Sequence, residues 1–330
     1  MEYGKILYLS RSDVEACGIS LDRSLEISEN TYSEHAKGNY EMPPKPGVHP
    51  TTCPGAFHHA MPAYLTNAAQ VGLKWIAVYG HNPAKYGINS ASGIIVLNDI
   101  ETGYPVAILE AGLITAIRTG NASGISAKYL ARKDSEVIGM VGCGEQGRNT
   151  VNSLLQVMPS IKEVKLFDLS QEMIDRLKAF VGERPGIKFT VCKDAEETIR
   201  DSDIVATSAP IPDRNPRYDA AWIKKGALVL PVHCNGYTLD FFRNASKFVV
   251  DDWNQYHNYM FGPERYYTDD MAAPYAQLGE IINGVKPGRE NDDEIIVNAN
   301  LGIALQDVSL GFEVYKTAQE KGIGTELSLF

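Results

Sequence analysis

Residues 137–168 read VIGMVGCGEQGRNTVNSLLQVMPSIKEVKLFD. The apolar run 137–141 predicts a buried parallel strand, glycines follow it at positions 142, 144 and 147, and an amphipathic segment leads to a second strand at 164–167. This strand–turn–helix–strand context makes the G-x-G-x-x-G pattern a dinucleotide-binding fingerprint. The glycines permit a tight turn and a close approach of backbone to a pyrophosphate, which the helix N-terminus attracts.

An acidic residue ends the second strand. Asp168 follows the last glycine of the fingerprint by about 20 residues, where a carboxylate can accept hydrogen bonds from the ribose of adenosine. The same carboxylate would repel the 2′-phosphate of NADP, and Leu169 and Ser170 supply no cation to offset that repulsion. The sequence therefore predicts NAD (NADH) as the cofactor rather than NADP.

Beyond Asp168, predicted helices and strands alternate. We expect helices at 170–181 and 194–200, and strands at 187–192, 203–208, 227–232 and 248–250. Alternation of this kind is typical of a doubly wound parallel sheet, in which ligands bind at the carboxyl ends of the strands. Ser208, Ala209 and Val232, which end or follow two of these strands, are therefore expected at the ligand edge.

The segment before the fingerprint has a different pattern. Residues 71–80 alternate as a strand does, with Lys74 at the centre, and residues 93–109 predict a hairpin, so that a mixed and largely antiparallel sheet is expected. A lysine inside an apolar strand either extends its amine to solvent or serves a site. The predicted helix 111–130 contains Gly120 at a cost of roughly 1 kcal/mol, which a close-packed neighbour or a ligand would justify.

Bulk properties narrow the range of functions. The chain has 330 residues, long enough for two domains, and carries a net charge of −10 without a basic stripe, which argues against a nucleic-acid partner. No apolar run approaches the roughly 20 residues of a membrane helix, and no signal peptide is recognised. The five cysteines are widely spaced and show no metal-ligand spacing, which predicts reduced thiols, no metal site and a cytoplasmic location.

Several motifs together resemble the ornithine cyclodeaminase/mu-crystallin family over nearly the whole chain. They are MPAYL (61–65), VGLKWIAVYGHNP (71–83), NDIETGYPVAILEAGLITAIRTGNASGISAKYLAR (98–132), GCGEQG (142–147) and NANLGIALQDV (298–308). The resemblance implies an α/β fold in which an NAD-binding Rossmann domain, residues 123–302, is inserted into a smaller α+β substrate-binding and dimerisation domain formed by residues 1–122 plus 303–330. It also implies a homodimer.

The family resemblance further implies hydride transfer between nicotinamide and the α-carbon of an amino acid or imino acid. Lys74 and Arg118 would bind the substrate carboxylate. Lys45, which stands where the family usually has arginine, would bind the carboxylate with them, although it lacks the planar fork of arginine. Together, a compact cation and a planar guanidinium can neutralise a carboxylate in a desolvated site. The residues expected to bind the cofactor are Arg118, Thr119, Gly142, Gly144, Glu145, Gln146, Gly147, Asp168, Ser208, Ala209 and Val232.

Two departures from the cyclodeaminases concern the substrate. Their glutamate before the Met-Pro pair is replaced in the segment Phe57-His58-His59-Ala60, and their aspartate after the strand at 227–232 is absent from Pro231–Gly236. Ornithine is therefore disfavoured, and His59 is expected to contact the substrate. His233 is the expected proton-transferring residue and joins Lys74 as a predicted catalytic residue, although His58 or His59 could serve, and each histidine could instead be structural.

The leading hypothesis is thus an NAD(H)-dependent oxidoreductase acting on the C–N bond of an amino acid or imino acid. It includes amino acid dehydrogenases, imine reductases and opine-forming enzymes. One alternative is an ornithine cyclodeaminase-type lyase, which would recycle NAD⁺ within each turnover. Another is a non-catalytic, crystallin-like binder of the dinucleotide, against which the presence of both Lys74 and Arg118 counts.

Overall fold

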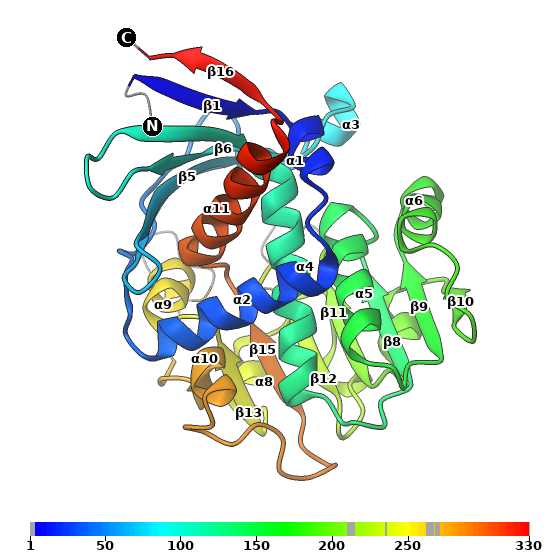
Figure 1. The fold of residues 1–330 in the computed structure, drawn as a ribbon. Helices are drawn as coiled ribbons and strands as arrows, with labels where there is room; N and C mark the ends of the chain where they lie inside the picture. Colours follow the sequence, from blue (N-terminus) through cyan, green and yellow to red (C-terminus); the bar gives the residue numbers. More distant parts are fainter. Residues whose placement is uncertain (1–3, 210–214, 235, 262–266, 268–270, 330) are drawn as a thin grey trace. The chain divides into compact units, whose positions relative to one another are not determined.

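The computed structural model describes residues 4–209, 215–234, 236–261, 267 and 271–329. The chain divides into two compact units (Figure 1). The first unit comprises Met1–Arg118 and Ile303–Phe330, and the second comprises Thr119–Gly302. The division falls inside helix α4 (Ala111–Leu130), and the boundary predicted between residues 122 and 123 lies in the same helix.

A mixed sheet forms the core of the first unit. Its strand order is β16-β1-β7-β6-β5-β4-β2, with the short β3 paired to β4. The β1–β7 pair is parallel and the remaining pairs are antiparallel, in agreement with the mixed sheet expected from the sequence. The strands are β1 (Lys5–Leu9), β2 (Tyr40–Glu41), β3 (Gly47–Val48), β4 (Phe57–Leu65), β5 (Gln70–Val78), β6 (Ala91–Asn98), β7 (Pro105–Glu110) and β16 (Thr325–Ser328).

Helix α11 (Ala304–Lys321) lies across one face of this sheet. A Cβ added at Gly72 of β5 would lie 3.3 Å from Val308, and one at Gly311 would lie 3.5 Å from Ile95 of β6, so the helix and the strands are in close contact. The helix ends at Gly322, whose φ of 65° is readily adopted only by glycine. The other helices of this unit are α1 (Arg11–Cys17), α2 (Leu21–Ala36) and α3 (Asn82–Tyr86).

The second unit is built on a parallel sheet with the order β10-β9-β8-β11-β12-β15-β13-β14. All of its strand pairs are parallel. The order reverses at β8, the strand that precedes the glycine fingerprint, and such a switch point is where doubly wound sheets bind ligands. The strands are β8 (Val137–Val141), β9 (Glu163–Phe167), β10 (Lys188–Val191), β11 (Ile204–Thr207), β12 (Leu228–Pro231), β13 (Lys247–Val250), β14 (Ala276–Gln277) and β15 (Ile296–Ala299).

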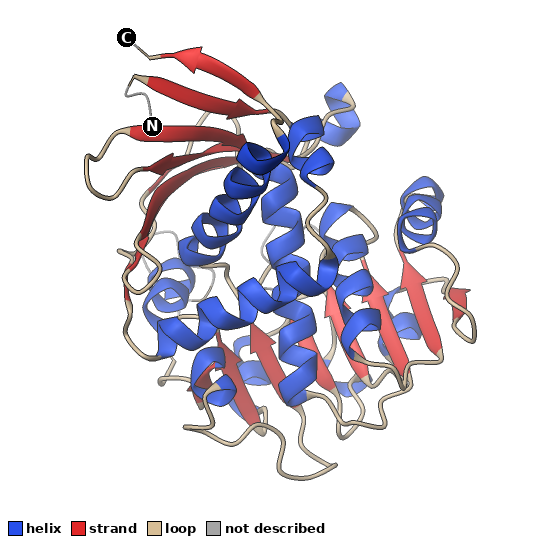
Figure 2. Cartoon of the chain, in the orientation of Figure 1, coloured by secondary structure: helices blue, strands red, loops and turns tan. Residues whose placement is uncertain are grey.

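Helices cover this sheet (Figure 2). Every residue of β11, β12, β13 and β15 is buried, as expected of parallel strands with both faces covered. The predicted doubly wound sheet is therefore confirmed. The helices are α5 (Glu145–Val157), α6 (Gln171–Val181), α7 (Ala195–Ile199), α8 (Leu239–Asn244), α9 (Trp253–Phe261) and α10 (Leu278–Ile282), with the 3₁₀ turn η1 (Ala220–Trp222).

The structure explains the costly glycine in α4 by helix packing. A Cβ added at Gly120 would lie 2.5 Å from the carbonyl oxygen of Asn149, and one at Gly124 would lie 3.1 Å from Ser153. Both neighbours belong to α5, so two glycines one turn apart let α4 and α5 approach closely. No ligand is needed to account for Gly120.

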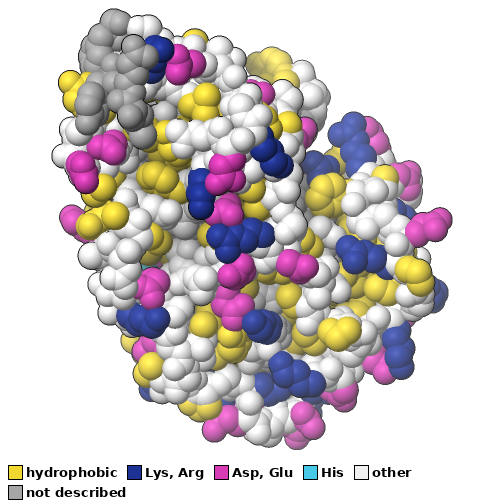
Figure 3. Space-filling view, viewed as in Figure 1, with side chains coloured by type: hydrophobic (Ala, Val, Ile, Leu, Met, Phe, Trp, Pro, Cys, Tyr) yellow, Lys and Arg dark blue, Asp and Glu magenta, His cyan; other side chains and the backbone are white. Residues whose placement is uncertain are grey.

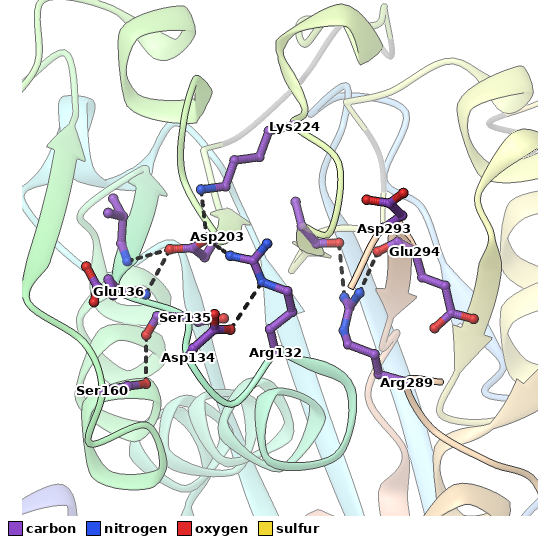
Figure 4. A network of polar contacts seen from close by, with 12 residues as sticks. Arg132, Asp134, Ser135, Glu136, Ser160, Asp203, Lys224, Arg289, Asp293 and Glu294 are labelled. Carbon is purple, nitrogen blue, oxygen red and sulfur yellow. Dashed lines mark hydrogen bonds and ion pairs between the residues drawn. The ribbon is translucent and has the colours of Figure 1, made fainter. Parts of the chain in front are cut away.

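A polar network fastens the amino ends of the second unit's strands (Figure 4). Asp203, just before β11, pairs through Oδ1 with Arg132 and Lys224 at 2.7 Å each, and its Oδ2 accepts the backbone N–H groups of Glu136 and Val137 at 2.8 and 2.9 Å. Burial alone would raise the pKa of Asp203, but Lys224 and the two backbone N–H groups lower it. Since ligands bind at the opposite, carboxyl edge, we assign this network to stability.

The distribution of charge on the surface, the polarity of the helices and the grouping of possible metal ligands bear on the function classes considered above. On the face shown in Figure 3, lysines and arginines are interspersed with aspartates and glutamates. In the part of the chain that the structure describes, no helix is long and apolar enough to cross a membrane. The same described residues bring no group of three or more His, Cys, Asp or Glu side chains together as a metal site.

Candidate functional site

The glycine fingerprint of the second unit forms a tight turn at the carboxyl end of β8. Gly142 has a φ of 94°, and a Cβ added there would lie 2.6 Å from the backbone nitrogen of Ala209. A Cβ added at Gly147 would collide with the carbonyl oxygen of Gly142. Gly142 must therefore be glycine because of its positive φ and the nearby backbone of Ala209. Gly147 must be glycine because the first turn of α5 packs directly against the backbone of Gly142.

Asp168 braces this turn. Its Oδ2 accepts the backbone N–H of Cys143 at 2.7 Å, and its Oδ1 accepts that of Ser170 at 2.9 Å. Ser208 fastens the turn from the neighbouring strand, because its Oγ donates to the carbonyl of Gly142 at 2.8 Å. Each carboxylate oxygen can accept a further bond, so Asp168 retains capacity for a ribose, and that role stays a prediction.

The start of α5 suits the phosphates of a dinucleotide. Gly144 is the N-cap and contributes no side chain, so the first N–H groups of a 13-residue helix follow the turn directly. Gln146 Oε1 is buried and has no hydrogen-bond partner among the described residues. Glu145 lies 3.5 Å from Arg148, which reduces the negative charge that a phosphate would meet. These features fit the cofactor.

The ends of β11 and β12 lie side by side and carry four of the predicted residues, Ser208, Ala209, Val232 and His233. The backbone N–H of Val232 donates to Thr207 at 2.9 Å, and His233 Nε2 lies 2.5 Å from the carbonyl oxygen of Ser208. Because a carbonyl can only accept, Nε2 is the donor in this contact. The Nδ1 of a neutral His233 is then the nitrogen that can accept a proton, and this histidine is exposed.

The first unit contains a buried ionic cluster. Lys74 lies at the centre of β5, between Met61 of β4 and Ile95 of β6, and is 0% exposed. Its Nζ lies 2.6 Å from Asp307 Oδ2 and 3.3 Å from Thr115 Oγ1. Arg118 Nε donates to the other oxygen of Asp307 at 3.1 Å. A single carboxylate on α11 thus joins two cations, one from β5 and one from α4.

The surroundings of Lys74 lower the pKa of its amine to near neutrality. Burial lowers the pKa most, Asp307 opposes that effect, and the guanidinium of Arg118 lowers the pKa further, to about 7. An amine with this pKa exists in both protonation states under physiological conditions. Lys74 can therefore act as a carboxylate-binding cation and as a proton donor or acceptor.

His59 lies on the same face of the sheet as Lys74, whereas His58 lies on the other. His59 is buried and pairs with Ile76, two residues along β5 from Lys74. Burial and the nearby Lys45, His49 and Lys74 lower the pKa of His59 to about 3. His58 instead stacks on Trp75 and lies 3.0 Å from the hydroxyl of Tyr79, so the structure does not bring it to the buried cluster.

The predicted residues are therefore distributed between the units. Lys74 and Arg118 meet in the first unit, where Lys45 helps to lower the pKa of Lys74, and Lys45 and Lys74 both help to lower the pKa of His59. Thr119 directly follows Arg118 in α4 but belongs to the second unit. The fingerprint, Asp168, Ser208, Ala209, Val232 and His233 also belong to the second unit.

Sequence analysis missed Asp307, which holds Lys74 and Arg118. A signal was present in the sequence, because Asp307 stands between the apolar residues Leu305 and Val308 of the segment that forms α11. An acidic residue that is buried among apolar side chains must be paired with a cation or be neutral. The available cations were Lys74 and Arg118, because each lies in a predicted strand or helix without an adjacent acidic residue.

Comparisons with known proteins cover the whole chain. The model of the ornithine cyclodeaminase/mu-crystallin family matches residues 6–322. N-((2S)-2-amino-2-carboxyethyl)-L-glutamate dehydrogenase of Staphylococcus aureus is 32% identical over 335 residues, with 99% of each chain covered. The solved Δ(1)-pyrroline-2-carboxylate reductase of Thermococcus litoralis, in complex with NADH and L-proline, has a TM-score of 0.86 at 30% identity, covering 97% of this chain and 99% of that one. An archaeal alanine dehydrogenase dimer with bound NAD has a TM-score of 0.85 at 33% identity, covering 99% and 100%.

Replacement of Asp307 by asparagine tests the ionic cluster. Asp307→Asn keeps the shape but leaves the buried Arg118 charge without its carboxylate, so we expect the free energy of unfolding at pH 7.5 to fall by about 3 kcal/mol. The loss of stability is limited because Lys74 can release its proton and so leave only the charge of Arg118 buried without a carboxylate. The measurement is urea denaturation, with Glu172→Gln as the control, since the Glu172–Arg176 pair is exposed and its loss should cost well under 1 kcal/mol. Equal losses in both variants would contradict the assigned role of Asp307.

Proposed function

The chain belongs to the ornithine cyclodeaminase/mu-crystallin family, and from this premise we propose that it is an NAD(H)-dependent oxidoreductase acting on the C–N bond of an amino acid or imino acid. The relatives named above support the proposal, since two are dehydrogenases of amino acids and one is a reductase of a cyclic imino acid, and two are solved with NADH or NAD bound. The observation that carries it is the buried pair of cations, Lys74 and Arg118, held by one carboxylate.

The charge balance of this cluster favours a carboxylate ligand. With Lys74 protonated, the state from which reduction would start, two positive charges face the single negative charge of Asp307. A buried net positive charge is costly, and a substrate carboxylate would neutralise it. In oxidation, where Lys74 would start neutral, the guanidinium of Arg118 would bind the carboxylate. A compact ammonium and a planar guanidinium, fixed by the same aspartate, would also orient the substrate so that its α-carbon is presented in one direction.

In the proposed reaction, NAD(H), when bound, would supply the hydride chemistry at the α-carbon. Side chains of this protein would bind the substrate and transfer the proton. Arg118 holds the carboxylate, because a guanidinium does not lose its proton at any working pH. Lys74, with its pKa near neutrality, takes a proton from the substrate amine during oxidation and returns one to the nitrogen during reduction. The exposed His233 remains the alternative proton-transferring group.

The activity can be tested by the absorbance of NADH. Purified protein with NAD⁺ is offered free amino acids, and protein with NADH is offered keto acids plus ammonia or amines, and cyclic imines. A steady change in NADH supports the proposed oxidoreductase. No net change, together with ammonia release from ornithine or lysine, would establish the lyase instead, and cofactor binding without any turnover would establish the dinucleotide binder.

The pH dependence of kcat/KM should show whether Lys74 is the proton-transferring residue. In the oxidative direction, kcat/KM should rise as Lys74 loses its proton, through a limb near pH 7, because kcat/KM reports the pKa of the free enzyme. Lys74→Arg keeps the positive charge but cannot deprotonate, so the limb should vanish and kcat should fall by about 10²–10⁴. A limb due to the substrate amine would persist in both proteins. If the limb near pH 7 survives Lys74→Arg but is lost in His233→Gln, the proton role belongs to His233.

We further propose that a second copy of the chain covers the outer face of the first unit's sheet. Trp75 and Ile94 are cross-strand partners on the face opposite Lys74, and each is 40% exposed. Apolar side chains exposed on a sheet favour an interface, and the archaeal alanine dehydrogenase relative is a dimer. A stable interface needs about 800 Å² from each partner.

Light scattering tests this interface. Ile94→Glu should convert the dimer to a folded monomer, because two copies of a buried, unpaired carboxylate would face the interface. Val285→Glu, at a 66% exposed valine of the second unit, is the control and should leave the mass unchanged. A wild-type monomer, or a dimer that survives Ile94→Glu, would rule out this face.

The cytoplasmic location also stays a proposal. The five cysteines are free thiols in the structure, and four of them are buried. Reduced thiols are typical of proteins kept in the cytoplasm.

A further inference from the structure

Aromatic rings surround His59, which lies on the same face of the sheet as Lys74. His59 stacks on Phe57 with ring centroids 4.3 Å apart, and the ring of His49 meets it edge-on at 6.1 Å. Lys74 lies diagonally opposite on the next strand. Residue positions related in this way lie about 7–8 Å apart, so the side chains of Lys74 and His59 are neighbours on one face of the sheet.

A glycine makes room for this histidine. Gly47 of β3 is the cross-strand partner of His59, and a Cβ added at Gly47 would lie 2.6 Å from His59 Cδ2 and 3.0 Å from Nε2. Any other residue at position 47 would displace the imidazole. The short strand β3 therefore fixes the ring beside the ionic cluster.

The electrostatic surroundings of His59 are positive. Lys45, His49 and Lys74 all oppose a proton on the ring, and burial adds to their effect. A neutral imidazole still offers one N–H donor, and the three neighbouring cations or potential cations attract a negative ligand. An ammonium group, the terminal group of ornithine, would be repelled by the same charges.

We propose that His59, together with Lys45 and His49, forms a subsite for a second anionic group of the substrate, so that the preferred substrates are amino or imino acids with a carboxylate at the far end of the side chain or N-substituent. This inference rests on the proposed function, because it assigns the α-carboxylate to Lys74 and Arg118. His59 donates its N–H to the second carboxylate, and Gly47 is the positioning residue that keeps the ring in place.

Acid–amide pairs of substrates measure the preference directly. The amide is the neutral isostere of the acid, so size and shape are held constant. With NAD⁺ in the oxidation assay, the kcat/KM for L-glutamate should exceed that for L-glutamine at least tenfold, or L-aspartate should exceed L-asparagine by the same factor. Binding is measured in parallel on the NAD⁺-loaded protein by calorimetry, with glutarate and succinate compared with butyrate and propionate.

Variants then assign the preference to the subsite. His59→Gln should lower the acid-to-amide ratio of kcat/KM at least tenfold. Gly47→Ala should also lower that ratio, by displacing the ring. The controls are His81→Gln, at an exposed histidine of the same unit, and Gly80→Ala, where an added Cβ meets nothing within 4 Å. Both controls should keep the wild-type ratio.

The two assays separate the possible failures. Selective binding of dicarboxylates that is lost in His59→Gln, without any turnover, would support the subsite while contradicting the proposed oxidoreductase. Turnover with no preference for acids over amides, or a preference that survives both His59→Gln and Gly47→Ala, would overturn the subsite and leave the oxidoreductase intact. Absence of both turnover and dicarboxylate binding would overturn both.

Discussion

The structure of the first unit depends on one carboxylate in its core. Asp307 is 0% exposed and forms ion pairs with both Lys74 and Arg118. Lys74 comes from a central strand, and Arg118 comes from a helix nearly two hundred residues away in sequence. Without the aspartate, two cations would be buried in an apolar layer at a large energetic cost. With the aspartate, the cluster carries one excess positive charge when Lys74 is protonated, and a carboxylate ligand would neutralise that charge.

In the second unit, too, one carboxylate holds several groups in place. It is Asp168, the acidic residue of the fingerprint. Asp168 accepts two backbone N–H groups, one of them from the middle of the glycine turn. If Asp168 also binds the ribose, as the sequence predicts, the shape of the turn and the identity of the cofactor are coupled through one side chain. A change of cofactor preference at this position would also remove a brace of the turn that receives the phosphates.

The sequence predicted the second unit well because its signals are local. The run of apolar strands, the glycines and the alternation with helices are each readable within about 15 residues. The partnership of Asp307 with Lys74 and Arg118 was not predicted, because it joins segments that come together only in the folded sheet and helix layers. The reason for Gly120 was also beyond the sequence, since the neighbour that requires it, Asn149, lies on another helix. His58 and His59 could not be told apart until the strand register placed them on opposite faces.

Helix α4 has a consequence for how this architecture can change. The boundary between the units falls inside this one continuous helix, with Arg118 on one side and Gly120 on the other. Each residue of a helix advances its side chains by about 100°. Each half of the helix therefore has a constraint of its own. An insertion or deletion between Thr115 and Arg118 would rotate one of these two side chains away from the ionic cluster of the first unit. One between Gly120 and Gly124 would rotate one of the two glycines away from α5 within the second unit. The length of α4 is thus fixed separately by the contacts of each unit, and substitutions are easier to accommodate here than insertions or deletions.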